Sequence, residues 1–384
     1  MCLISLFFQI MLNMTRPILA LYAVDLGADA FRIGTLTAAY AFLPLLFAIH
    51  AGKIADRIGD RIPVMAGISG TIAGLLLPFL FPAIPALYVS QLLVGISHIF
   101  INISLQNVLG NSASKENRDR YFSTFSMVVA AGGFIGPIAG GYLAEDFSYA
   151  VVFLTAAMAG LVPAVLSGFI PVIIRSLKTE GEKRAEPFAA FKLLRQPILR
   201  KALASSALVL YSRDVFVAYF PLLAVGAGLQ ESEIGWVIAV QGLAMVAVRF
   251  FLVKLTALAG REAVLFGSVM TAGASFLLLP FADHLAVFML LSACMGFGLG
   301  CGQPLSMTTI YNASPKNRTG EVLGMRIASN RLSQLVAPLL FGTVGAAAGL
   351  LSVFLLSGVF LIGGAVVTRV PPDQEGPQDS ERQV

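Results

Sequence analysis

The chain has 384 residues, of which 57% are hydrophobic and only 12% are charged. Soluble globular domains carry about 25% charged residues, so this composition excludes a soluble protein. The formal charge of +5 does not indicate nucleic-acid binding, because the basic residues are spread over short loops rather than gathered on one face. The sequence therefore predicts a protein whose solvent is lipid.

Apolar stretches of about 20 residues, the length that crosses a bilayer, recur along the chain. They do not alternate with the period of two that is typical of membrane β-barrels, so we expect α-helices. Twelve spans are predicted, at residues 3–24, 33–52, 63–82, 86–111, 122–144, 148–174, 202–224, 234–255, 263–281, 285–311, 321–346 and 349–369.

The basic residues predict how the spans are oriented, because cytoplasmic loops carry an excess of Lys and Arg. With both termini in the cytoplasm, the inner loops hold Lys53, Arg57, Arg61, Lys115, Arg118, Arg120, Lys254, Arg261, Lys316 and Arg318. The outer loops hold only Arg32, and they carry the acids Asp25, Asp29, Glu145, Asp146, Glu231, Glu233 and Asp283. We therefore expect a multi-pass protein of the cell membrane with both termini cytoplasmic.

A polar central loop at 175–201 divides the chain into two six-span halves, 1–174 and 202–369, and the Pro-rich residues 370–384 are predicted to be a disordered cytoplasmic tail. The halves repeat one another, because a shift of 201 residues carries Gly95 onto Gly296 and Pro137 onto Pro338. Two such bundles, with the binding site between them, are an arrangement found in secondary transporters. The expected fold is all-α, with twelve transmembrane helices in two pseudo-symmetric six-helix bundles.

The loop after the second span reads GKIADRIGDR. It resembles the signature loop of the major facilitator superfamily, with Asp60 where the family usually has a basic residue; the matching residues are Gly52, Asp56, Arg57, Gly59 and Arg61. The resemblance implies a central cavity lined by spans one, four, seven and ten, with contributions from five and eleven. It also implies a cytoplasmic gate, in which Asp56 lies at the positive end of the eleventh span and Arg57 pairs with an acid such as Asp119. The alternative is a basic loop that only fixes the topology.

The fifth span carries a second resemblance, to the Gly-Pro motif of the drug and metabolite antiporters of this superfamily. The matching residues are Gly132, Gly136, Pro137, Gly140 and Gly141, and Ser123 replaces an earlier glycine of the motif. Closely spaced glycines favour tight helix packing, and Pro137 permits a bend. The resemblance implies export, with generic helix packing as the alternative. One departure is Gln91, because many proton-coupled members have an arginine there.

Charged residues at mid-bilayer cost about 2.5–3.5 kcal/mol, so each one needs a reason. Arg16 and Arg213 each precede a tyrosine by six residues, and we interpret them as matching positions in the first and seventh spans. A guanidinium binds a carboxylate or phosphate through two parallel hydrogen bonds, so this pair of arginines suits an anionic substrate. The alternative is that each arginine pairs with a carbonyl group or with Asp214. Asp214 is itself the candidate for the coupling proton, unless it is held in a fixed ion pair with Arg331 or Arg249.

Polar residues at helical spacing indicate further cavity positions. The fourth span places His98, Asn102 and Gln106 on one face, and the eleventh span aligns Arg326, Asn330 and Gln334. The candidate residues for the cavity and for substrate binding are Asn13, Arg16, His98, Asn102, Gln106, Arg213, Gln303, Asn330, Arg331 and Gln334.

The sequence contains no phosphate-cradling loop and no cluster of metal-ligand residues, so we expect no enzyme, cofactor or metal. The first hypothesis is a monomeric transporter working by alternating access, which exports small amphipathic or anionic organic compounds coupled to an ion, with the proton as candidate. The second is an importer or exchanger of organic anions, or a lipid-like flippase. The third is a non-transporting receptor or scaffold, which has no need of a gate loop.

Overall fold

The computed structural model describes residues 1–112, 118–170, 197–313 and 319–368, and within these ranges every regular element is helical. The helices of the first half are α1 (Cys2–Asp25), α2 (Ala30–Ile58), α3 (Arg61–Leu80), α4 (Ile84–Ser112), α5 (Arg118–Asp146), α6 (Tyr149–Ala159) and α7 (Leu161–Ser167). Those of the second half are α9 (Pro197–Gly226), α10 (Glu231–Ala259), α11 (Arg261–Leu278), η1 (Leu279–Phe281), α12 (Leu285–Ala313), α13 (Thr319–Ala348) and α14 (Leu350–Thr368).

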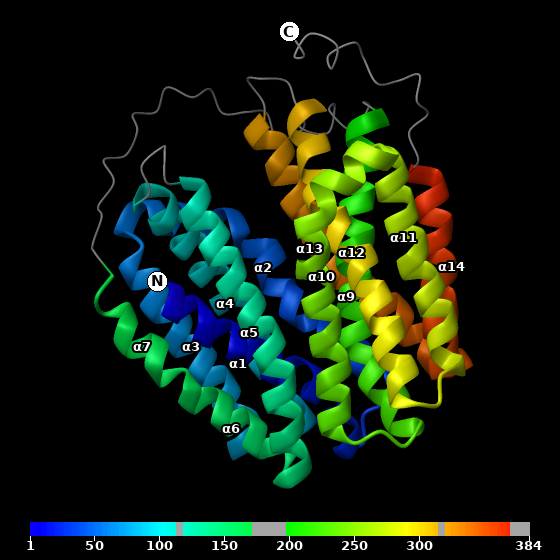
Figure 1. Ribbon diagram of the computed structural model, residues 1–384. Helices are drawn as coiled ribbons and strands as arrows, with labels where there is room; N and C mark the ends of the chain where they lie inside the picture. Colours follow the sequence, from blue (N-terminus) through cyan, green and yellow to red (C-terminus); the bar gives the residue numbers. More distant parts are fainter. Residues whose placement is uncertain (113–117, 171–196, 314–318, 369–384) are drawn as a thin grey trace, which may run out of the picture.

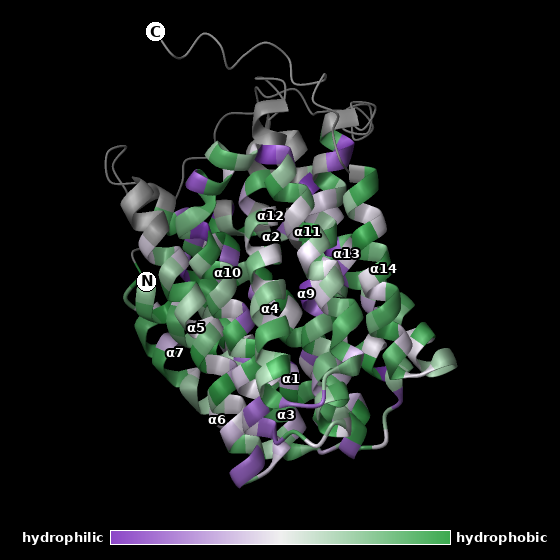
Figure 2. Cartoon of the chain, turned by 45° about the vertical axis from the view of Figure 1, so that its right-hand side comes forward, coloured by the Kyte–Doolittle hydropathy of each residue, from purple (hydrophilic) through white to green (hydrophobic). Residues whose placement is uncertain are grey.

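The helices form twelve candidate membrane spans in the described part of the chain. Large apolar side chains cover the flanks of the molecule, as Leu258 at 86% exposure and Phe169 at 81% illustrate. Figure 2 shows this hydrophobic cover along the sides of the bundle, with hydrophilic residues gathered toward its two ends. Such a surface is stable in lipid, so the chain is a multi-pass α-helical membrane protein, as predicted.

The predicted sixth span is confirmed as the candidate span Tyr149–Ser167, but it is interrupted at Gly160 between α6 and α7. Pro163 has no N–H to donate to the carbonyl of Ala159, and its ring crowds that carbonyl, so the helix is broken there. Of the predicted central loop, residues 197–201 already belong to α9, and the rest lies outside the described residues. The predicted tail at 370–384 also lies outside them.

Helices α1 to α7 form one bundle and α9 to α14 the other (Figure 1). The offset of 201 residues recurs in the backbone of the two bundles. Gly27 and Gly228 have φ of +83° and +84°, and Gly59 and Gly260 have φ of +82° and +78°. These values lie in the left-handed region that glycine adopts without strain at helix ends.

The two ends of the bundle differ in charge. The acidic end carries Asp25, Asp29, Glu145, Glu231 and Asp283, and the basic end carries Arg57, Arg61, Lys254 and Arg261. In Figure 1 the two bundles converge toward the acidic end, at the bottom, and diverge toward the basic end.

Two reciprocal crossings join the bundles near the acidic end. Gly34 of α2 lies so close to Pro338 of α13 that an added Cβ would collide with the carbonyl oxygen of that proline. Gly235 of α10 lies in the same way against the carbonyl oxygen of Pro137 in α5. Only glycine lets two helix backbones approach this closely. The crossings therefore close the acidic end.

Hydrogen bonds between the bundles add to this closure. The Tyr149 hydroxyl donates to Glu231 Oε1 at 2.8 Å, and the Ser232 N–H donates to Glu145 Oε2 at 3.1 Å.

Candidate functional site: a central cavity between the bundles

A cavity of about 380 Å³ lies between the two bundles, on the basic-end side of the crossings. Its walls come from α1, α2, α4 and α5 of the first bundle and from α9, α10 and α13 of the second. The polar and charged residues that line it are Gln9, Asn13, Arg16, Tyr40, His98, Ser126, Arg213, Asp214, Arg249, Asn330, Arg331 and Gln334.

The helices around this cavity overlap with those that the family resemblance implies. The first, fourth and seventh spans (α1, α4 and α9) line it, as do the fifth and eleventh (α5 and α13). The second and eighth spans, α2 and α10, also contribute. No described side chain of α12 lines the cavity, and the side chain of Gln303 lies outside the described residues.

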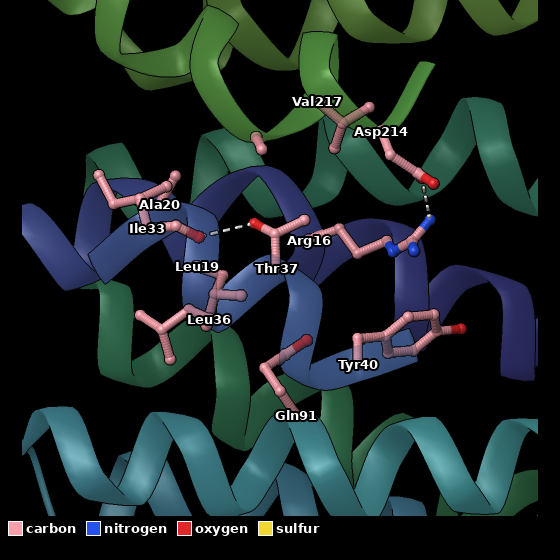
Figure 3. A pocket seen from close by; sticks show the side chains of 11 residues that line it. Arg16, Leu19, Ala20, Ile33, Leu36, Thr37, Tyr40, Gln91, Asp214 and Val217 are labelled. Atoms are coloured by element: carbon pink, nitrogen blue, oxygen red, sulfur yellow. Dashed lines mark hydrogen bonds and ion pairs between the residues drawn. The ribbon is translucent and has the colours of Figure 1, made fainter. Parts of the chain in front are cut away.

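A chain of polar contacts crosses from α13 to α1 at this cavity. Arg331 Nη1 donates to Gln334 Oε1 at 2.9 Å, and Gln334 Nε2 donates to Asp214 Oδ2 at 2.8 Å. The other oxygen of Asp214 lies 3.6 Å from Arg16 Nη1, and Figure 3 shows this ion pair as a dashed line. The ion-pair partner of Asp214 is thus Arg16 of the opposite bundle, and Arg331 reaches Asp214 only through Gln334.

The chain continues from Arg16 into α2 and α4. The guanidinium carbon of Arg16 lies 4.5 Å from the centre of the Tyr40 ring, so the cation rests on an aromatic face. The Tyr40 hydroxyl lies 2.7 Å from His98 Nδ1, and the Asn102 amide nitrogen hydrogen-bonds His98 Nε2.

Arg213 stands apart from this chain. It lines the cavity from α9, and within the part of the chain that the structure describes it makes no hydrogen bond or ion pair. The cavity wall carries four arginines, Arg16, Arg213, Arg249 and Arg331, but Asp214 is its only described carboxylate. Unpaired charges are costly away from bulk water, so this excess of positive charge attracts anions.

The other candidate residues lie at different distances from the cavity. Asn13 lines it and donates to the Gln9 carbonyl at 2.7 Å, and Asn330 lines it and accepts from the Ser206 hydroxyl at 3.1 Å. Asn102 contacts the cavity only through His98, and Gln106 is exposed and is not among the lining residues.

The interpretation of Arg16 and Arg213 as matching positions is wrong by one helical turn. The offset of 201 residues that relates Gly27 to Gly228 places Val217 at the position of Arg16. Arg213 therefore lies one turn closer to the basic end. The two tyrosines are not equivalent, so their equal spacing from Arg16 and Arg213 does not indicate matching positions. Tyr22 donates to Pro78 within the first bundle, whereas Tyr219 donates to Pro338 at a crossing.

Sequence reasoning missed Tyr40 as a cavity residue, and it favoured snorkelling or a structural ion pair for Arg249, which also lines the cavity. A signal for Tyr40 was present, because the offset relates it to Gln241, so that both halves have a hydrogen-bonding side chain at this position. Gly95 and Gly296 pack against the carbonyl oxygens of these two residues.

The glycine motif of α5 contacts two helices. Gly132, Gly136 and Gly140 pack against α1, where an added Cβ would meet Gln9, Asn13 or Met14. On another face, Pro137 and Gly141 pack against the beginning of α10. The motif thus holds the polar face of α1 at the cavity and joins the bundles.

The gate loop is described only in part. Gly59 ends α2 in the left-handed conformation, and Arg57 is exposed. The surroundings of Gly52 and the side chains of Asp56 and Asp119 lie outside what the structure describes. Asp60, the departure from the family pattern, is 1% exposed and accepts from Asn107 at 3.3 Å.

Comparisons with known proteins agree with this architecture. A sequence profile described as Major Facilitator Superfamily matches residues 1–230 and 202–384. An uncharacterised MFS-type transporter of Methanocaldococcus jannaschii, MJ1560, is 21% identical over 364 residues, which cover 92% of each chain. The quinolone resistance protein NorA of Staphylococcus aureus is 21% identical over 361 residues, covering 93% of this chain and 92% of its own.

Among solved structures, a bacterial homologue of the human lysosomal transporter Spinster, in an inward-facing and occupied conformation, superposes with a TM-score of 0.76. It is 13% identical, and the match covers 97% of each chain. The family and its relatives are transporters and not enzymes. The chain belongs to the Major Facilitator Superfamily.

Proposed function

We propose that the chain moves small amphipathic organic compounds that carry an anionic group, by alternating access and with coupling to a proton. The observation that carries this proposal is the cavity wall, with four arginines, one described carboxylate and an Arg213 that makes no hydrogen bond or ion pair among the described residues. An anionic group supplies the missing negative charge, and a guanidinium binds it through two parallel hydrogen bonds.

Export is the proposed direction. The basic end belongs in the cytoplasm by the positive-inside rule, and the cavity lies on that side of the closed crossings. An exporter loads its substrate from the cytoplasm. The likeness to NorA, which is named for quinolone resistance, and the glycine motif of α5 also support export.

The second candidate is an importer or exchanger of organic anions. The Arg16–Asp214 ion pair favours it, because it places a proton acceptor beside an anion-binding guanidinium. The same protein, cavity and proton site serve either direction.

The test is equilibrium binding to the purified protein, with three ligands of similar shape and different charge. Naphthalene-2-sulfonate is the anion, naphthalene-2-sulfonamide the neutral analogue, and a naphthyl trimethylammonium the cation. We expect the sulfonate to bind best. Arg213→Lys keeps the positive charge but loses the planar guanidinium that makes two parallel hydrogen bonds, so it should weaken sulfonate binding about tenfold. Arg213→Gln should weaken it more, because it also removes the charge.

Arg32→Gln is the matched control, because Arg32 lies at the acidic end, away from the cavity. Binding of the neutral analogue should not change in any variant. If the cation binds best and the Arg213 variants leave all three affinities unchanged, the proposed substrate class is wrong.

A further inference from the structure

The Arg16–Asp214 ion pair joins the two bundles, and its two members differ in their access to the cavity. The Arg16 side chain is 26% exposed, whereas that of Asp214 is 6% exposed. An anion in the cavity can therefore reach Arg16 more easily than a solvent-borne group can reach Asp214, which is almost fully buried. An anion bound there competes with Asp214 for the same guanidinium.

Among the described residues Asp214 makes its ion pair with Arg16, although other arginines line the same cavity. Besides Arg16, the charged and titratable cavity groups near it are Tyr40 of α2, His98 of α4, Arg213 of its own helix, Arg249 of α10 and Arg331 of α13. Arg331 acts on Asp214 through the amide of Gln334. The sequences of α12 and α14, which also pack against α9, contain no Asp, Glu, Lys, Arg or His.

Displacement by an anion has a defined consequence for protons. Once Arg16 turns to the anion, Asp214 is an enclosed carboxylate that keeps its hydrogen bond from Gln334 but has lost its ion-pair partner. An enclosed carboxylate without a direct ion-pair partner is costly, and taking up a proton removes its charge. Conversely, a proton on Asp214 releases Arg16 for the anion. Each ligand therefore strengthens the binding of the other, and linkage makes the effect reciprocal.

We infer that an anion held by Arg16 travels together with a proton on Asp214, so that anions and protons move in the same direction. This inference rests on the proposed function, because it takes Arg16 as a contact of an anionic substrate. A cationic group would have the opposite effect, since it would compete with the proton for Asp214. For a substrate whose only charge is the anion, this coupling favours the second candidate direction, import driven by proton entry, and export of such a substrate then runs only down its own gradient.

Proton uptake on binding tests the inference directly. Naphthalene-2-sulfonate is added to the purified protein in a weakly buffered solution with an indicator dye, because the charge of this sulfonate is the same at every pH used. We expect up to one proton to be taken up per sulfonate bound. Affinity should be greatest at low pH and should fall by about tenfold per pH unit once Asp214 has lost its proton in the free protein.

Asp214→Asn tests the assignment of the proton site. Asparagine has the shape of the protonated acid and can still accept from Gln334, so sulfonate should bind this variant at every pH as it binds wild type at low pH, without proton uptake. Asp283→Asn is the control, because that carboxylate is exposed and lies at the acidic end. It should behave like wild type.

The outcomes separate the inference from the proposal beneath it. If the sulfonate binds without proton uptake, or with proton release, the inference is wrong and the anion site stands. If Asp214→Asn still takes up a proton, the proton site lies elsewhere. If wild-type protein binds no sulfonate, both proposals fail. Even if the Asp214 variant does not fold, proton uptake by the wild-type protein shows whether anion binding is coupled to proton binding.

Discussion

Tyr40 links the two parts of the polar chain, because its ring supports Arg16 and its hydroxyl contacts His98. The ring keeps the guanidinium at the cavity, and a cation on an aromatic face gains about 0.5–2 kcal/mol. The hydroxyl makes a hydrogen bond with an imidazole nitrogen of His98, which is half-buried. The two functions belong to different atoms of one side chain, so substitutions can separate them.

We predict that Tyr40→Leu weakens sulfonate binding about three- to tenfold, whereas Tyr40→Phe changes it little. Leucine removes the face on which Arg16 rests, and phenylalanine keeps it. The measurement is the binding titration described above, with Tyr142→Leu as the control at an exposed tyrosine. Equal losses in the two Tyr40 variants would show that the hydroxyl, and not the ring, holds Arg16.

The sequence predicted the charged cavity residues better than their partners. Arg16, Arg213 and Asp214 were found because a charge in an apolar span needs a reason. Tyr40 is uncharged, and tyrosine is common in membrane helices, so its presence in an apolar span did not mark it as a cavity residue. The pairing of Arg16 with Asp214 depends on how two bundles dock, and nothing in the local sequence of α1 or α9 encodes it.

At the scale of the helix, the crossings rely on glycine. Gly34 and Gly235 allow direct contact between the backbones of two helices. A larger residue at Gly34 would separate α2 from α13, and a larger residue at Gly235 would separate α10 from α5. The offset of 201 residues relates Gly34 to Gly235 in the sequence. Their role was not predictable, because it arises from contacts between helices that belong to opposite halves of the chain.

We predict that Gly34→Val holds the acidic end open. Spin labels on Phe31→Cys and Thr343→Cys, in a background without the native cysteines, should move apart relative to the protein with Gly34. The side chain collides with the backbone of Pro338, so the crossing cannot form. Gly363→Val is the matched control, since a Cβ at that helical glycine meets nothing within 4 Å. An unchanged distance in Gly34→Val would show that the crossing is dispensable.

At the scale of the molecule, one end is closed and the other holds the cavity, so alternating access requires a second state in which the basic end closes. The sequence predicted the twelve spans and the loop proposed as the gate. It did not predict the break at Gly160, because a proline in an apolar span is compatible with either a bend or a break.

We predict that Asp56→Asn shifts the population toward the state with the basic end open. A charge at a helix terminus contributes about 1 kcal/mol, so the ratio of the two states should change about fivefold. Spin labels on Ile58→Cys and Leu258→Cys should lose the shorter distances that wild type shows, and transport should fall while the protein remains folded. The distance distribution should be unchanged in Asp283→Asn. If it is also unchanged in Asp56→Asn, this aspartate has no part in closure.

The crossings have one more consequence, which concerns symmetry. Gly34 contacts Pro338, and the offset of 201 residues turns this pair into Gly235 and Pro137, which also touch. The same holds for Gly342 against Ala30 and Gly141 against Glu231. When two residues from different halves are in contact, their equivalents under the repeat offset are also in contact. The same reciprocity holds at the interface of an isologous twofold dimer. Each six-helix half thus carries both partners of the backbone crossing, so two identical copies of one half contain the glycine and proline positions of both crossings.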